Sequence, residues 1–140
     1  MRNKFFPAVC ALVVLVLAGS VYWIERGLKT ADIAYFQTVP VDPRALLMGD
    51  YMTLAYDFER VALPQDTALY IGADQKVSAE GPGKKITVKY HGDRFKIPHQ
   101  FYFKEGTGDK YARAKYVKMR VLPDGRLLAL ELTDETLNVL

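Results

Sequence analysis

The sequence is poor in the residues that nucleophilic catalysis needs. It contains a single cysteine, Cys10, and its serines are Ser20 and Ser78. Cys10 and Ser20 fall in an uncharged apolar run, and Ser78 lies in a turn-rich region without a nucleophile-elbow pattern. A serine or cysteine hydrolase is therefore disfavoured. The part of the chain after Ile24 has no disulfide either, so it depends on an ordinary hydrophobic core.

Histidine is scarce as well. His91 and His99 are eight residues apart with Pro98 between them, which is no recognised metal-ligand spacing. We expect both to be solvated residues at strand ends and predict no metal or cofactor. The glycine-rich "EGTGDK" lacks the Gly-Lys-Ser/Thr ending of a phosphate loop and is interpreted as a turn. Asp109 within it is predicted to be the N-cap of a short helix.

Acidic residues are absent from the first 24 positions. The chain has 19 Lys and Arg and 16 Asp and Glu, with Arg2 and Lys4 ahead of the first acid. The remainder carries 17 − 16 = +1. An evenly mixed domain of this kind gives no reason to expect nucleic acid as a partner.

What the N-terminal region does have is a long apolar run. Phe5 to Ile24 contains 20 residues without a charge, which as a helix spans about 30 Å, the thickness of a hydrocarbon core. Tyr22 and Trp23 fall at its end, where amphipathic aromatic residues favour the membrane boundary. The basic residues before it predict an N-terminus in the cytoplasm and an exported C-terminal part.

These observations divide the chain into a basic flank (1–4), a lipid-embedded anchor (5–24), a linker (25–31) and an exported domain (32–140). The expected location is the inner (cytoplasmic) membrane, with one span and a periplasmic or extracytoplasmic domain. A signal peptide cleaved after Ala18 is the alternative, and the run beyond Ala18 favours a retained anchor.

Beyond the anchor, alternating apolar and polar residues predict a mainly β fold. The longest alternation is 51–61, in which Met52, Leu54, Tyr56 and Phe58 face the core. The other predicted strands are 32–39, 68–71, 76–79, 86–90, 100–104, 116–122 and 126–132. Pro123-Asp124-Gly125 joins the last two as a hairpin, and 109–116 holds one short helix. The sequence leaves a barrel and an open sandwich equally possible.

The stretch before the longest alternation, "VPVDPRALLMGDY", is explained by turn chemistry. Asp42 suits an N-cap, Pro43 the first helical position and Gly49 a left-handed stop. Arg44 and Asp50 are not required by that turn. Either Arg44 pairs with Asp50 or Asp42 across the turn, or Arg44 and Asp50 form, with the Tyr51 hydroxyl, a polar cluster that faces a partner.

This stretch carries a resemblance to a known family. "GDYMTLAY", Gly49 to Tyr56, resembles the motif of the GDYxxLxY family, and "TVPVDPRALLMGDY" is similar to its usual lead-in. "FYFKEGTGDKYARAKYVKMRVLPDGRLLALEL" resembles its second block. The residues that the resemblance singles out are Asp42, Pro43, Arg44, Gly49, Asp50, Tyr51, Leu54, Tyr56, Glu105, Gly106 and Gly108. Met48 departs from the basic residue that is usual before the glycine.

The resemblance implies a single-span protein without an assigned activity, associated with a multi-span membrane protein. We therefore predict an accessory or binding domain rather than an enzyme, with an unassigned oligomeric state. Two alternatives remain open. One is an envelope hydrolase that uses Asp50 and Glu105 as paired acids, and the other is a small-ligand sensor with a pocket at the Gly-Asp-Tyr corner.

Overall fold

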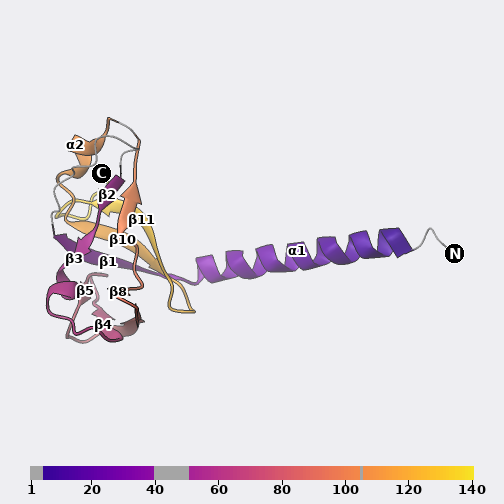
Figure 1. The fold of residues 1–140 in the computed structure, drawn as a ribbon, viewed down its shortest axis with the longest axis horizontal. Coiled ribbons are helices and arrows are strands. Elements are labelled where there is room, and N and C mark those ends of the chain that lie inside the picture. The colour runs from indigo at the N-terminus through magenta and orange to yellow at the C-terminus, as the bar shows by residue number, and fades with distance from the viewer. Residues whose placement is uncertain (1–4, 40–50, 105) are drawn as a thin grey trace. The chain divides into compact units, whose positions relative to one another are not determined.

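The computed structural model describes residues 5–39, 51–104 and 106–140. The chain forms two compact units, Met1–Ala31 and Asp32–Leu140. The first unit is built on helix α1 (Phe5–Lys29), and the second contains every described strand (Figure 1).

Helix α1 contains the predicted membrane span and continues past its apolar run. It takes in most of the segment 25–31 that the sequence predicts as a linker. The extension places Glu25 and Lys29 one turn apart, and their side chains pair at 2.9 Å. α1 is long and apolar enough to cross a membrane.

The second unit is an antiparallel β domain, as predicted. Its strands are β1 (Asp32–Val39), β2 (Tyr51–Thr53), β3 (Ala55–Tyr56), β4 (Thr67–Ile71), β5 (Val77–Ser78), β6 (Lys84–Val88), β7 (Tyr90–His91), β8 (Arg94–Phe95), β9 (Gln100–Tyr102), β10 (Tyr116–Val121) and β11 (Leu127–Thr133). They form a four-stranded sheet in the order β11-β10-β1-β3, a three-stranded sheet β5-β4-β6, and the pairs β2-β9 and β7-β8. Across the described residues the sheets stay open and close no barrel.

The main sheet is organised around β1, which pairs with β10 on one side and with β3 on the other. The predicted hairpin between β10 and β11 is confirmed. Its turn is closed by a hydrogen bond of 2.9 Å from the Gly125 amide to the Leu122 carbonyl. Gly125 has φ +85°, a backbone conformation that favours glycine. This explains why a glycine follows Pro123 and Asp124 in the turn.

The prediction of one strand over 51–61 is wrong, although its buried face is correct. Met52, Leu54 and Tyr56 are buried, and Phe58 is partly buried against the core. The chain changes partners at Leu54, because β2 pairs with β9 whereas β3 pairs with β1. After Tyr56 it turns into a 3-10 helix, η1 (Asp57–Arg60), because the Glu59 carboxylate accepts the Tyr56 amide at 3.2 Å.

The short helix is also placed differently from the prediction. It is α2 (Gly108–Tyr111), and the residue at its N-cap is Thr107 rather than Asp109. The Thr107 hydroxyl donates to the Lys104 carbonyl at 2.6 Å, so the turn before the helix uses its side chain. Asp109 lies in the first turn, where its negative charge is still favourable to the helix dipole.

One hydrophobic core joins the sheets of the β domain. Phe36 of β1, Leu69 of β4, Val117 and Met119 of β10 and Leu132 of β11 are almost fully buried. Figure 1 shows α2 and β2 at one end of this domain and β4 and β5 at the other. The core lies between them and fixes the positions of the surface features described next.

Candidate functional site

The predicted site residues divide into two groups. The first group lies outside the described residues and consists of Asp42, Pro43, Arg44, Gly49, Asp50 and Glu105. The predicted capped turn and the predicted pair of Asp50 and Glu105 therefore also lie outside them. Tyr51, Leu54, Tyr56, Gly106 and Gly108 are described, and they have different surroundings.

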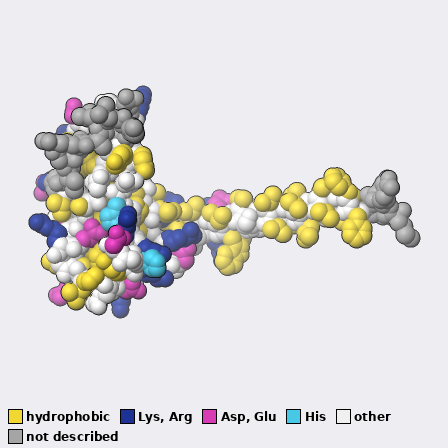
Figure 2. Space-filling view, in the orientation of Figure 1, with side chains coloured by type: hydrophobic (Ala, Val, Ile, Leu, Met, Phe, Trp, Pro, Cys, Tyr) yellow, Lys and Arg dark blue, Asp and Glu magenta, His cyan; other side chains and the backbone are white. Residues whose placement is uncertain are grey.

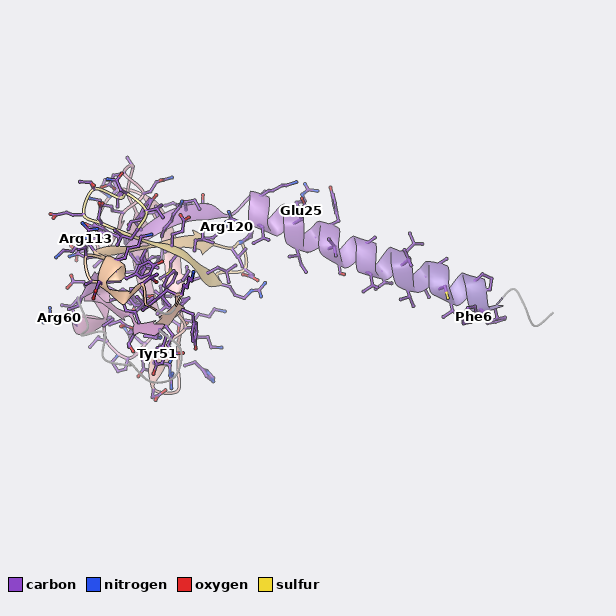
Figure 3. All side chains as sticks on the ribbon, turned by 90° about the horizontal axis from the view of Figure 1, so that it is seen from above. Phe6, Glu25, Tyr51, Arg60, Arg113 and Arg120 are labelled. Atoms are coloured by element: carbon purple, nitrogen blue, oxygen red, sulfur yellow. The ribbon has the colours of Figure 1, made fainter. Side chains whose placement is uncertain are left out.

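Tyr51 belongs to a two-stranded ribbon formed by β2 and β9. It is the residue directly opposite Tyr102, and the two rings lie 5.9 Å apart between centroids. Tyr102 is 70% exposed, so this aromatic pair faces outward (Tyr51 is labelled in Figure 3). The ribbon therefore brings the first and second sequence blocks of the motif side by side.

Leu54 and Tyr56 hold the ribbon to the core. Leu54 is 2% exposed, and its amide donates to the His99 carbonyl at 2.8 Å. Tyr56 is 1% exposed and donates its hydroxyl proton to the Pro98 carbonyl. Burial, with a smaller contribution from the charge of Glu59, raises the pKa of the Tyr56 hydroxyl far above its ordinary value. The group therefore remains a hydrogen-bond donor at any physiological pH.

Sequence reasoning missed the partners of Tyr56. Oε1 of Glu59 lies 2.8 Å from Nε2 of His99, while the other oxygen accepts the Tyr56 amide. The His99 ring packs edge-on against the Tyr56 ring, with centroids 6.0 Å apart. His99 is thus half-buried and paired, and the expectation that it is a solvated residue is wrong. His91 is exposed, as predicted.

The glycines of the second block serve the turn before α2. Gly106 has φ +78°, which favours glycine. Gly108 opens α2 beside the Phe103 ring, where a β-carbon would lie 3.7 Å from the nearest ring atom. Gly108 is therefore a position with ordinary packing space, and Gly106 is the one fixed by backbone conformation.

A surface groove of about 880 Å³ lies beside these residues. One wall is the hairpin β7–β8, and the other includes Asp124 to Leu128 at the β10–β11 turn. Pro98 and His99 also line it, so the groove reaches the contacts of Tyr56. Figure 2 shows His side chains (cyan) beside Lys and Arg (dark blue) and also beside Asp and Glu side chains (magenta) on the face in view.

The described residues offer surfaces for binding. Within residues 5–39, 51–104 and 106–140, no three His, Cys, Asp or Glu side chains come together to hold a metal ion. The Tyr56, Glu59 and His99 contacts are made inward, between segments of the fold. What faces outward is the aromatic ribbon and the basic groove.

The fold and these surfaces define a small antiparallel β protein joined to one helix that is long and apolar enough to span a membrane. The chain belongs to the GDYXXLXY protein family, whose model matches residues 13–132. No match is found among curated proteins or among solved structures.

Proposed function

We propose that the protein is a membrane-anchored binding subunit whose β domain docks on a multi-span membrane protein. α1 holds the domain at the inner membrane as a single span. Arg2 and Lys4 favour a cytoplasmic N-terminus, which leaves the domain in the periplasm or outside the cell. The kind of partner follows from the family resemblance.

The observation that carries the proposal is the outward-facing pair of the half-buried Tyr51 and the exposed Tyr102. Both come from the sequence blocks that define the family, and both lie on a ribbon of two strands. Tyrosine supplies a large contact area at low entropic cost, and exposed aromatic residues are enriched among the residues that contribute most to interfaces. The outer edges of β2 and β9 have no strand partner among the described residues, so they could also accept a strand.

Support also comes from the way the motif is divided. Leu54 and Tyr56 are buried and hold the ribbon to the core. Tyr51 is only half-buried, and the exposed Tyr102 donates its hydroxyl to the Gln100 side chain at 2.8 Å within the ribbon. The fold therefore uses Leu54 and Tyr56, whereas the outward part of the ribbon is available to a partner.

Co-purification tests this proposal. The full-length protein is isolated from native membranes in mild detergent, as wild type and as Tyr102→Ala. Leu63→Ala is the matched control, because Leu63 is 65% exposed and lies outside the ribbon. We expect wild type and Leu63→Ala to retain a multi-span protein and Tyr102→Ala to lose it.

A fold measurement accompanies the test. Near-ultraviolet circular dichroism should be unchanged in Tyr102→Ala apart from the lost tyrosine, because the residue lies at the surface. If Tyr102→Ala retains the same partner as wild type, the ribbon is not the docking surface. If wild type retains no membrane protein, the binding-subunit proposal is wrong.

The two alternative functions depend on residues outside the described ranges. The envelope hydrolase requires Asp50 and Glu105 to converge, and the ligand sensor requires a pocket at Gly49 to Tyr51. Both stay predictions, and no described contact favours either over the binding subunit.

A further inference from the structure

The hairpin β7–β8 carries positive charge on one face only. Its strands, Tyr90–His91 and Arg94–Phe95, pair across a Gly92-Asp93 turn, and the Lys96 amide extends the ladder to the Lys89 carbonyl at 2.7 Å. Since side chains alternate along a strand, Lys89, His91, Arg94 and Lys96 share one face. Tyr90 and Phe95 share the other, with ring centroids 5.0 Å apart.

This arrangement is unfavourable for the isolated domain. Lys89 lies opposite Lys96. Like charges placed directly across a ladder destabilise it. The aromatic face explains why the hairpin packs on the core, but packing does not require cations on the outer face.

Nearby acids neutralise this face only in part. Asp93 lies in the turn and contacts Arg94 at 3.3 Å, and Asp66 accepts the Tyr90 backbone amide at 2.8 Å. Across the groove, Asp124 is engaged by Arg126 at 2.6 Å. Among the described residues, no carboxylate forms an ion pair with Lys89 or Lys96.

The groove beside this face has an apolar floor and a basic rim. Phe95, Ile97 and Leu127 are buried in its floor, and Leu128 is partly exposed. Arg126 adds a cation from the opposite wall. An anion that also carries apolar groups matches both parts of this surface.

The topology of the β domain relates this groove to the start of β1. Asp32 pairs with Val121, and Val121 pairs with Leu127, which lines the groove. Only Thr30 and Ala31 separate Asp32 from the last residue of α1. The five helical residues beyond Ile24 rise about 7.5 Å, close to the depth of the headgroup layer on one side of a bilayer, and the three extended steps that follow cover at most about 11 Å, against a Debye length of about 8 Å at physiological ionic strength. A chain held in the membrane by α1 therefore keeps the first residue of β1 within electrostatic reach of the lipid surface.

We infer that the basic face of β7–β8 and the adjoining groove bind the anionic phospholipid headgroups of the membrane that holds α1. The phosphate groups neutralise Lys89 and Lys96, compete with Asp93 for Arg94, and remove the repulsion across the hairpin. The apolar floor accommodates the glycerol and upper acyl region. This inference rests on the membrane anchor of the proposed function but not on its protein partner. Lipid binding by β7–β8 and docking on a membrane protein can therefore fail independently of each other.

Amine labelling of the full-length protein tests the inference. The protein is placed in nanodiscs of phosphatidylcholine alone and in nanodiscs that also contain phosphatidylglycerol. A lysine-reactive reagent is applied, and modification is read by mass spectrometry at Lys89, Lys96 and Lys115. Lys115 is the internal reference, because it is exposed and its carbonyl accepts the amide of Thr38, near the opposite end of β1 from Asp32.

We expect anionic discs to lower labelling of Lys89 and Lys96 about threefold, the Boltzmann factor of one charge at a surface potential of about −30 mV. Lys115 should be unaffected, and added salt should restore labelling. In anionic discs Arg94→Gln should recover part of the labelling of both lysines. The matched variant Arg113→Gln, at an exposed position two residues before Lys115, should not (Arg113 is labelled in Figure 3).

Three outcomes would overturn the inference. Equal labelling in the two kinds of disc would show that the headgroups are not in contact. Equal recovery in Arg94→Gln and Arg113→Gln would reduce the effect to overall charge. Protection by inorganic phosphate or polyglutamate in phosphatidylcholine discs would assign the groove to a soluble anion or an acidic protein segment.

Discussion

The hydroxyl of Tyr56 provides the most direct test of how the family motif stabilises the fold. Tyr56→Phe removes one oxygen and leaves the ring, which is 1% exposed, in place. The lost bond is the one to the Pro98 carbonyl, which joins η1 and β3 to the segment before β9. The substitution therefore isolates one hydrogen bond between two distant parts of the chain.

The expected cost can be estimated from the surroundings of the bond. Leaving a buried acceptor unsatisfied costs about 1–3 kcal/mol. Because Pro98 is only half-buried, water can partly replace the donor, and we expect about 1–2 kcal/mol. For a domain the size of Asp32–Leu140 the unfolding entropy is about 0.23 kcal/mol/K, so Tm should fall by about 4–9 °C.

Thermal unfolding of the full-length protein in detergent measures this change. Near-ultraviolet circular dichroism is the suitable signal, since it follows the aromatic core. Tyr102→Phe is the matched control, because its hydroxyl bond to Gln100 is exposed and its loss should shift Tm by no more than about 2 °C. If Tyr56→Phe melts within that range of the control, the Tyr56–Pro98 bond does not stabilise the fold as argued.

Three further predictions concern the same region and the neighbouring strands β4 and β6. Burial raises the pKa of the Tyr56 hydroxyl in the folded protein, so the unfolded chain loses the hydroxyl proton first as the pH rises. Stability from this group is complete below about pH 10 and falls by up to about 1.4 kcal/mol per pH unit above it. Urea unfolding at increasing pH should show this loss in wild type and not in Tyr56→Phe. Glu59→Ala leaves the Tyr56 amide and the His99 ring without their partner, and should lower the free energy of unfolding by about 1–3 kcal/mol in urea titrations. A cost below about 0.5 kcal/mol would contradict that account. Gly83→Ala would place a β-carbon 2.2 Å from the Ile71 carbonyl oxygen, so we expect a loss of about 1–3 kcal/mol and faster amide exchange in β4 and β6. Unchanged exchange would show that the backbone accommodates the methyl group.

The sequence predicted the parts of the fold in which local pattern and turn chemistry agree. In 116–132, clean alternation flanks Pro123-Asp124-Gly125, and the hairpin formed as expected. The prediction of α1 likewise needed only the length and apolarity of its run. These elements depend on neighbours in the sequence, so a local pattern is sufficient to find them.

The partners of Tyr56 could not be found in this way. A strand over 51–61 assigns Glu59 to the outward face, together with Tyr51 and Thr53. The 3-10 turn instead rotates Glu59 back toward Tyr56, and His99 arrives from a segment 40 residues further along. Nothing near His99 in the sequence signals that contact. The basic face of β7–β8 was also missed, although its signal is local. The alternation of Lys89, His91, Arg94 and Lys96 around Gly92-Asp93 is visible in the sequence and follows hairpin rules.

The pairing of β1 with β10 has a consequence for the order in which the protein can form. β1 leaves the ribosome before the other described strands, yet its partners from Gln37 to Asp32 are Tyr116 to Val121. Long-range pairings of this kind fold slowly, since a long loop must close before any contact forms. The membrane helix is complete long before that. The half-made domain therefore has to pass through biosynthesis with its central strand still lacking β10, the stage at which a chaperone would have most to protect.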